Sequence, residues 1–256
     1  MDNFNKGNER IENLNRGGYQ IIQNSDAFCF GLDAVLLAWY ASQKIKKSSR
    51  VIDLGTGTGI LPLLICGRTS VQHVEALEIQ PEMAEMANRS VFLNHLEDRI
   101  QIHCDDLRNP THTFHSSYYD VVVSNPPYMP VGKGDQNLKK TFAIARHEVS
   151  CTLDDIARFA FVHLKDRGKL FMVHKADRLV DILSTLRTHQ LEPKRLKMIQ
   201  PFADQPANLV LIEAIRRGQP RLEIAPPLIV YQRPNCYTEE INQIYGTDKP
   251  ATSKSL

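Results

Sequence analysis

Short apolar segments alternate with longer amphipathic segments between residues 50 and 190. The apolar segments have the length and the β-branched content of buried strands, whereas the longer ones repeat apolar positions at helical spacing. The predicted strands are Arg50–Leu54, His73–Glu78, Ile100–His103, Tyr119–Ser124 and Gly168–His174, and the predicted helices are Ile60–Cys66, Glu82–Asn94 (opened by Pro81), Thr152–Leu164 and Ala176–His189. This alternation predicts a parallel sheet with helices on both faces.

The pattern changes after residue 190, where strand-like segments follow one another without helices. They are Pro193–Ile199, Leu209–Arg216 and Leu228–Tyr231, joined by loops that contain proline and glycine. Strands that follow a parallel sheet in this way are typical of an antiparallel edge. The sequence therefore predicts an α/β fold with a doubly wound, mostly parallel sheet and an antiparallel C-terminal edge strand.

The segment before the first of these strands carries short elements of its own. Ile21–Ile22 is expected to form a short strand, and Leu32–Tyr40 a helix whose inward side chains are Leu32, Val35, Leu36 and Trp39. We interpret residues 1–45 as an N-terminal cap packed on the core. Residues 46–256 then form the main unit, so the chain is effectively one domain.

The composition is that of a globular protein, since 42% of the 256 residues are hydrophobic and 23% are charged. No apolar run approaches the roughly 18 residues that span a bilayer. The polar N-terminus, Met1–Lys6, lacks the apolar core of a signal peptide. Five scattered cysteines and nine histidines show no metal-ligand spacing. We expect a reduced, cytoplasmic monomer without a metal and without a membrane partner.

Charge is unevenly distributed, although the formal net charge of the chain is only +2. The segment Lys133–Arg233 holds 18 Lys and Arg against 11 Asp and Glu, a net of +7, and the rest of the chain has a net of −5. Such asymmetry is typical of polyanion-binding surfaces, and equally of an ordinary solvated face. The small total therefore does not exclude RNA, and any RNA binding is expected to be salt-sensitive.

A glycine-rich turn, Asp53–Gly59, joins the first strand of the sheet to its helix. Glycines allow a tight turn and close approach to a ligand, and this turn lies at the carboxyl ends of the strands, where ligands bind. The spacing is G-x-G-x-G, so the third glycine of the dinucleotide fingerprint is misplaced. A tight turn without a ligand is the alternative.

Three acids near this turn favour S-adenosylmethionine over NAD. Asp53 precedes the glycines and suits a ligand with an amino group rather than a pyrophosphate. Glu78 ends the second strand, where a carboxylate can accept both ribose hydroxyls. Asp105 follows the third strand and could accept an exocyclic purine amine. The alternative interpretation is a set of solvated acids.

The segment Asn125-Pro126-Pro127-Tyr128 ends the fourth strand. The prolines fix the backbone and remove N–H donors, which leaves carbonyl groups free to accept hydrogen bonds. The Asn125 side-chain oxygen and the Pro126 carbonyl could accept the two hydrogens of a planar amine, while Tyr128 stacks on an aromatic substrate. Attack of that nitrogen on a sulfonium methyl group depends mainly on in-line positioning. A proline-capped strand end is the alternative.

Both motifs together resemble class I S-adenosylmethionine-dependent methyltransferases that modify amino groups. Further segments resemble the bacterial tRNA1(Val) adenine-N6 methyltransferase family, namely Gln23–Ala38, Ala145–Glu148, Tyr237–Ile241 and Ile244–Gly246. The resemblance covers nearly the whole chain. It implies a seven-stranded Rossmann-like sheet and methylation of the adenosine adjoining the anticodon. It implies catalytic roles for Asn125, Pro126, Pro127 and Tyr128, and cofactor contacts from Phe30, Asp33, Asp53, Gly55, Thr56, Gly57, Gly59, Glu78, Ile79, Asp105, Asp106 and Asn125.

A glycine- and lysine-rich loop, Val131–Lys140, follows Tyr128 directly and suits contact with phosphates. The candidate RNA contacts are Lys133, Lys139, Lys140, Arg146 and Arg195. A plain solvated loop is the alternative. At the level of function, three alternatives to tRNA methylation stay open: a protein glutamine-N5 methyltransferase, a non-catalytic RNA-binding protein with a vestigial cofactor pocket, and a dinucleotide-dependent oxidoreductase.

Overall fold

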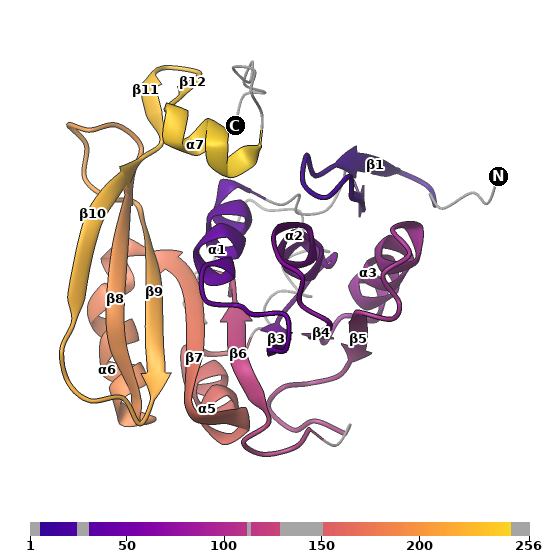
Figure 1. The fold of residues 1–256 in the computed structure, drawn as a ribbon, viewed down its shortest axis with the longest axis horizontal. Helices are drawn as coiled ribbons and strands as arrows, with labels where there is room; N and C mark the ends of the chain where they lie inside the picture. The colour runs from indigo at the N-terminus through magenta and orange to yellow at the C-terminus, as the bar shows by residue number, and fades with distance from the viewer. Residues whose placement is uncertain (1–5, 25–30, 112–113, 129–150, 247–256) are drawn as a thin grey trace, which may run out of the picture.

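The computed structural model describes residues 6–24, 31–111, 114–128 and 151–246, arranged around one large sheet (Figure 1). Its eight strands have the order β10-β8-β9-β7-β6-β3-β4-β5. Neighbouring strands are parallel except at β9, which is antiparallel to both β7 and β8. The strands are β3 (Arg50–Leu54), β4 (His73–Glu78), β5 (Ile100–Cys104), β6 (Tyr119–Ser124), β7 (Leu164–Lys175), β8 (Leu191–Gln200), β9 (Leu209–Arg216) and β10 (Glu223–Ile229).

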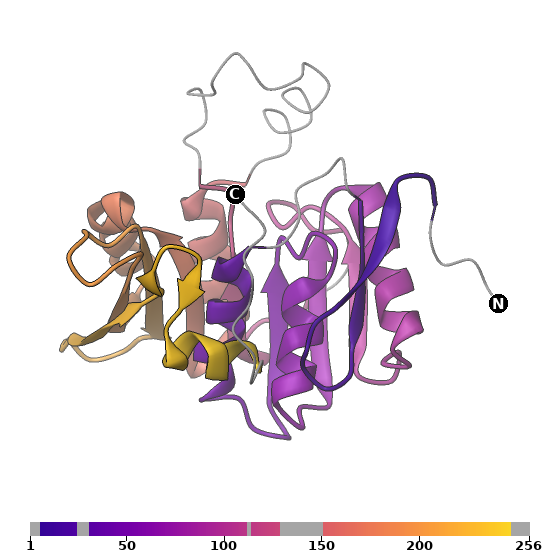
Figure 2. The same ribbon diagram turned by 90° about the horizontal axis from the view of Figure 1, so that it is seen from above.

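Helices cover both faces of this sheet (Figures 1 and 2). On one face lie α1 (Leu32–Ser42), α2 (Ile60–Arg68) and α3 (Pro81–Leu93), and on the other lie α5 (Leu153–His163) and α6 (Leu179–Thr188), the latter preceded by a 3-10 turn, Ala176–Arg178. Successive side chains of β3 point to opposite faces of the sheet, so Val51 lies in the core on the α1 side and Ile52 in the core on the α5 side. The doubly wound α/β prediction is confirmed. No helix of the described ranges is long and apolar enough to cross a membrane.

The sheet differs from the prediction in two details. It has eight strands rather than seven, and the antiparallel strand β9 lies inside the sheet instead of at its edge. A short connection leads from β9 across β8 to β10. β10 pairs with the outer side of β8, and these two strands are parallel. Pro226 and Pro227 lack N–H donors, and the register of β10 shifts between Ala225 and Leu228. Prolines with a bulge are tolerated on an edge strand, which is where β10 lies.

The N-terminal segment forms a hairpin of β1 (Glu9–Asn13) and β2 (Gln20–Asn24), of which only part of β2 was predicted. The hairpin packs on α3, where Ile22 N–H donates to Ser90 Oγ at 3.0 Å. Helix α1 was expected to bury one face. Eight of its eleven residues are buried, because α2, β7, β9 and the C-terminal helix surround it. The division of the chain at residue 45 stays a prediction.

The C-terminal residues close over the same face. A small hairpin of β11 (Tyr231–Arg233) and β12 (Cys236–Tyr237) leads into α7 (Glu239–Tyr245), which packs against α1. Ile241 and Ile244 are buried in the core that α1 shares. The sequence motif around Tyr237 and Tyr245 therefore belongs to the segment that packs α7 against the helix that begins at Leu32.

Candidate functional site

Four parallel strands bring the predicted motifs to one edge of the sheet. In the register of β6 with β3, Ser124 is opposite Leu54, so the turn that starts at Gly55 and the segment that starts at Asn125 leave adjacent strands. Leu54 is in turn opposite Leu77 of β4, and Glu78 is opposite Cys104 of β5. Glu78 and Asp105 therefore lie at the same edge, as expected for the carboxyl ends of parallel strands.

The glycine turn after β3 uses left-handed backbone at Gly55, Gly57 and Gly59, with φ of 74°, 58° and 87°. Only glycine adopts such angles without strain. A Cβ at Gly55 or Gly57 would meet no protein atom within 4 Å, whereas one at Gly59 would lie 3.2 Å from the Cβ of Ala87 on α3. Gly55 and Gly57 therefore face open space that a ligand can occupy. Gly59 instead allows α2 to begin close to α3.

Asp53, at the end of β3, is a fully buried carboxylate. Neither of its oxygens meets hydrogen-bond geometry with a described residue. The pKa of Asp53 is raised to about 7, mainly by burial and to a smaller degree by the charge of Glu78, while the nearby Thr56 hydroxyl lowers it. A buried acid without a partner is costly, so this group is suited to a cationic ligand.

Glu78, at the end of β4, is buried and held by backbone donors. Its Oε2 accepts from Gly57 N–H at 2.8 Å, and its Oε1 accepts from Gln80 N–H at 2.9 Å. Oε1 also accepts a longer hydrogen bond, 3.4 Å, from Gln80 Nε2, whereas Oε2 keeps a further lone-pair direction. The side chain is thus fixed beside the glycine turn and can still accept hydroxyl groups from a ligand.

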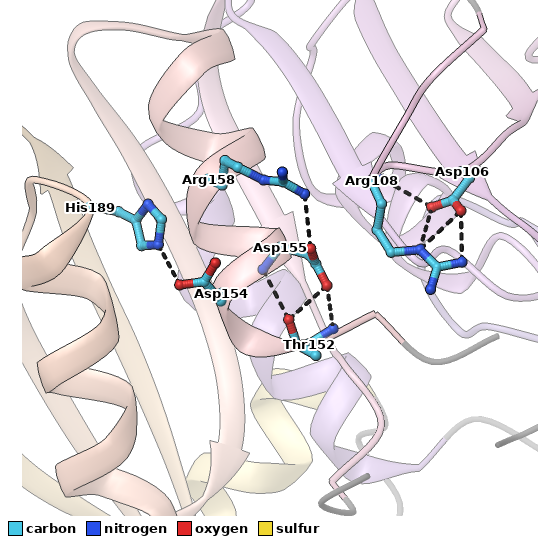
Figure 3. Close-up of polar contacts among 7 residues, drawn as sticks. All are labelled: Asp106, Arg108, Thr152, Asp154, Asp155, Arg158 and His189. Carbon is cyan, nitrogen blue, oxygen red and sulfur yellow. Dashed lines mark hydrogen bonds and ion pairs between the residues drawn. The ribbon is translucent and has the colours of Figure 1, made fainter. Parts of the chain in front are cut away.

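In the loop after β5, Asp105 and Asp106 were both predicted to contact the cofactor, but both carboxylates accept hydrogen bonds from the loop itself. Asp105 Oδ1 accepts from Asp106 N–H at 2.8 Å, and its Oδ2 accepts from the Thr111 hydroxyl at 3.1 Å. Asp106 forms a bidentate pair with Arg108, with a shortest distance of 2.7 Å (Figure 3). Hydrogen bonds from Arg108 lower the pKa of Asp106. Asp106 is therefore already paired with Arg108 of the same loop. Ile79, another predicted cofactor contact, is half-buried between Glu78 and the start of α3.

Tyr128 connects the Asn-Pro-Pro-Tyr segment to α1. Its hydroxyl lies 2.5 Å from Asp33 Oδ2 and 2.9 Å from Asn125 Oδ1. The edge of its ring meets His174 at the end of β7, with ring centroids 5.3 Å apart. Burial raises the pKa of Tyr128 and lowers that of His174, so both side chains are neutral at neutral pH. The Asn125–Tyr128 segment is thus held by Asp33 of α1 on one side and by His174 of β7 on the other.

The candidate RNA contacts are largely not placed. Four of them, Lys133, Lys139, Lys140 and Arg146, lie outside the described residues, as does Phe30, which was predicted to contact the cofactor. Arg195 lies in the middle of β8, where it pairs with Glu223 at 3.1 Å and its guanidinium is 6.0 Å from the Tyr40 ring centroid. The structure does not bring Arg195 to the carboxyl edge. Among the residues described, no group of three or more His, Cys, Asp or Glu side chains is arranged to hold a metal.

Two residues of the site were missed from the sequence in the roles that the structure gives them. His174 contacts Tyr128 and is 6% exposed. A polar residue that ends an otherwise apolar strand at the carboxyl edge was the available signal. Gln80 supplies a backbone donor to Glu78, and its side chain gives no signal of that role.

The sheet, the glycine turn and the edge acids define a Rossmann-like α/β protein of the class I methyltransferase type. A solved structure of this fold, described as a predicted O-methyltransferase from Agrobacterium tumefaciens, superimposes with a TM-score of 0.67 at 22% identity over 84% of this chain and 97% of that one. The chain belongs to the methyltransferase small domain family, whose sequence model matches residues 33–189. It is thus a methyltransferase, and this membership implies the use of S-adenosylmethionine.

Curated relatives cover most of the chain. A protein from Porphyromonas gingivalis (strain W83) is 28% identical over 199 residues, which is 76% of this chain and 77% of the relative. A protein from Haemophilus influenzae (strain 86-028NP) is 28% identical over 222 residues, 86% of this chain and 91% of the relative. Both are named tRNA1(Val) (adenine(37)-N6)-methyltransferase.

Proposed function

We propose that this chain transfers a methyl group from S-adenosylmethionine to N6 of an adenine in tRNA, the adenosine adjoining the anticodon of a valine tRNA. The observation that carries the proposal is the position of the Asn125–Tyr128 segment, one parallel strand away from the open glycine turn. The names of the relatives, which match over most of both chains, support the choice of substrate.

The edge residues fit the cofactor in charge and in shape. The unpartnered buried carboxylate of Asp53 suits the α-amino group of S-adenosylmethionine, and the open space at Gly55 and Gly57, on either side of the buried Thr56, suits close approach. Glu78 would accept the ribose hydroxyls and Asp105 the adenine amine, with Ile79 beside the base. When bound, the cofactor supplies a methyl group that the positive sulfonium activates. Phe30 would close the methionine end, while the Asp33 carboxylate is engaged by the Tyr128 hydroxyl.

The chain's own residues would orient the substrate amine. A base reaches this site only after it leaves its stack, and Tyr128 offers an aromatic face for the flipped ring. The Asn125 side-chain oxygen and the Pro126 carbonyl would each accept one amine hydrogen, while Pro127 keeps the backbone rigid. These contacts hold the nitrogen lone pair in line with the methyl group, which is the main requirement of the transfer.

Binding of the RNA is proposed to involve the basic part of the chain. Lys133, Lys139, Lys140 and Arg146 follow the catalytic segment in sequence, and their role stays a prediction. Arg195 is the weakest of these candidates because it already pairs with Glu223. Methyl transfer is therefore expected to weaken with salt.

The function is tested by Asn125→Ala, with Asn88→Ala as a matched control. Asn88 is an exposed residue of α3 on the same chain. We expect Asn125→Ala to abolish methyl transfer to tRNA while calorimetry shows nearly unchanged cofactor affinity, and Asn88→Ala to behave as wild type. Mass spectrometry of tRNA nucleosides from cells with and without the protein tests the substrate. Unchanged N6-methyladenosine would rule out tRNA, and transfer to a protein glutamine would favour that alternative.

A further inference from the structure

The Tyr128 hydroxyl lies between two oxygen atoms and has only one proton to give. Asp33 Oδ2 is 2.5 Å away, and the nearest atom of the Asn125 amide, drawn as Oδ1, is 2.9 Å away. A phenol donates once and can accept from a second group. Two acceptors cannot both receive the same proton at full strength, so one of the two neighbours must be a donor.

Asp33 is the fixed acceptor of this pair. It lies in the first turn of α1, is 8% exposed, and its Oδ1 accepts from Ala34 N–H at 2.8 Å. A carboxylate at a helix N-terminus is stabilised by the free backbone N–H groups there. Helix α1 is itself embedded in the core, so the carboxylate cannot move away from Tyr128 without disturbing that packing.

The Tyr128 ring is fixed independently of its hydroxyl. It meets the ring of His174, and His174 Nδ1 accepts from the backbone N–H of Lys175 at 2.8 Å. Charge-assisted hydrogen bonds are shorter and stronger than neutral ones, so the tyrosine proton belongs to the 2.5 Å contact with Asp33. The hydroxyl oxygen is then an acceptor toward Asn125.

We propose that Asp33 is a positioning residue that acts through Tyr128 to set the orientation of the Asn125 amide. With the Tyr128 proton held by Asp33, the Asn125 NH2 group donates to Tyr128 Oη, and Asn125 Oδ1 turns toward the substrate amine. The oxygen and nitrogen of an asparagine amide exchange places by a half-turn, and hydrogen-bond partners decide between the two orientations. The inference rests on the proposed function, since it explains how the amide presents an acceptor to an amine.

The proposal makes a separate prediction for each of two variants. In Asp33→Asn, the new amide can donate to Tyr128 Oη, which frees the tyrosine proton for Asn125 Oδ1 and turns the acceptor away from the substrate. In Tyr128→Phe, the ring stays against His174 but the link between Asp33 and Asn125 is lost. Tyr40→Phe is the control, because Tyr40 is a buried tyrosine whose hydroxyl donates to Arg195 C=O at 3.4 Å, away from this site.

The first test is a double-mutant cycle with saturating cofactor. We expect Asp33→Asn and Tyr128→Phe each to lower kcat by about ten- to a hundredfold, as loss of orientation does. The double variant should be no slower than the slower single variant, Tyr40→Phe should match wild type, and the dissociation constant for S-adenosylmethionine should change less than about threefold. If the losses in kcat of the two single variants multiplied in the double variant, the proposal would be overturned. A loss of affinity for S-adenosylmethionine with unchanged kcat would also overturn it and make Asp33 a cofactor contact.

The second test does not depend on catalysis. The side-chain NH2 signals of Asn125 are identified in nitrogen-15 spectra by their disappearance in Asn125→Ala. We expect their hydrogen exchange to be slow in the wild type and faster in both Asp33→Asn and Tyr128→Phe. Equal hydrogen-exchange rates of the Asn125 NH2 group in all three proteins would overturn the proposal that Asp33 orients this amide through Tyr128, even if the wild type methylates tRNA. Conversely, if exchange is faster in the two variants but the wild type leaves tRNA unmodified, the role of Asp33 in orienting Asn125 is retained and only the proposed substrate is rejected.

Discussion

The carboxylate of Glu78, at the end of β4, accepts a hydrogen bond of 2.8 Å from the backbone N–H of Gly57 in the turn after β3. The same strand end also receives the N–H groups of Gly55 and Thr56, which donate to Leu77 C=O at 2.8 and 3.0 Å. Three contacts from β4 thus shape a turn that belongs to β3. The conformation of the glycine turn depends on the neighbouring strand as much as on its glycines.

Replacing Glu78 should therefore damage the turn as well as remove a ligand contact. We expect Glu78→Ala to weaken S-adenosylmethionine binding at least about tenfold, because a hydrogen bond to a charged group contributes roughly 1.5–3 kcal/mol. Isothermal titration calorimetry measures this change. Glu82→Ala, an exposed acid four residues further along the chain, should bind as wild type. Equal affinity of the two variants would remove Glu78 from the cofactor site.

Gly57 and Gly59 should respond differently to a methyl group. In Gly57→Ala the left-handed backbone costs about 1–2 kcal/mol of stability, but the new Cβ meets no protein atom. It would project into the space proposed for the cofactor, so we expect affinity to fall more than stability. Gly59→Ala adds crowding against Ala87, and its free energy of unfolding in urea should fall further, by about 1–3 kcal/mol. The reverse order of stability would contradict this assignment.

Asp53 makes the stability of the protein dependent on pH. Its pKa is raised from an ordinary 3.8 to about 7 in the folded protein. Between these values the native state keeps a proton that the unfolded state releases, so stability falls as pH rises from about 4 to 7. Asp53→Asn removes this contribution. Without cofactor, we expect the stability of Asp53→Asn relative to wild type to increase between pH 4.5 and pH 8 by about 3 kcal/mol, measured by urea unfolding.

The same titration should control cofactor affinity. An ionised Asp53 favours a cation, so wild-type affinity for S-adenosylmethionine is expected to rise by a little under tenfold between about pH 6 and pH 7.5. Asp53→Asn should bind weakly at both pH values. A variant that kept the wild-type pH dependence would show that another group titrates.

The N-terminus of α5 is held by a capping box, visible in Figure 3. Thr152 Oγ1 accepts from Asp155 N–H at 3.2 Å, and Asp155 Oδ2 accepts from Thr152 N–H at 2.9 Å. We expect Thr152→Ala to lower the free energy of unfolding by about 1 kcal/mol and to leave cofactor affinity unchanged. Asp154→Ala breaks only an exposed pair with His189 and should cost less, about 0–1 kcal/mol. Chemical denaturation of both variants separates the two effects.

The parallel half of the sheet and the edge that carries the site could be predicted from the sequence. β3, β4 and β6 have the predicted bounds, and the turn at Gly55 and the segment at Asn125 follow adjacent strands as expected. Local signals sufficed here, because buried parallel strands are continuous apolar runs and their carboxyl ends share one edge. The same rule places Asp53, Glu78 and Asp105 at this edge, and their roles in cofactor binding stay a prediction.

What the sequence by itself determined was therefore which residues reach the carboxyl edge, since periodicity and turn chemistry are local. Only the tertiary structure decided what those residues touch there. Asp33 and Tyr128 are 95 residues apart, β9 lies inside the sheet although it was expected at the edge, and α1 is buried almost all round. Such contacts depend on which elements pack against each other over long distances in the chain, and no local periodicity encodes that choice.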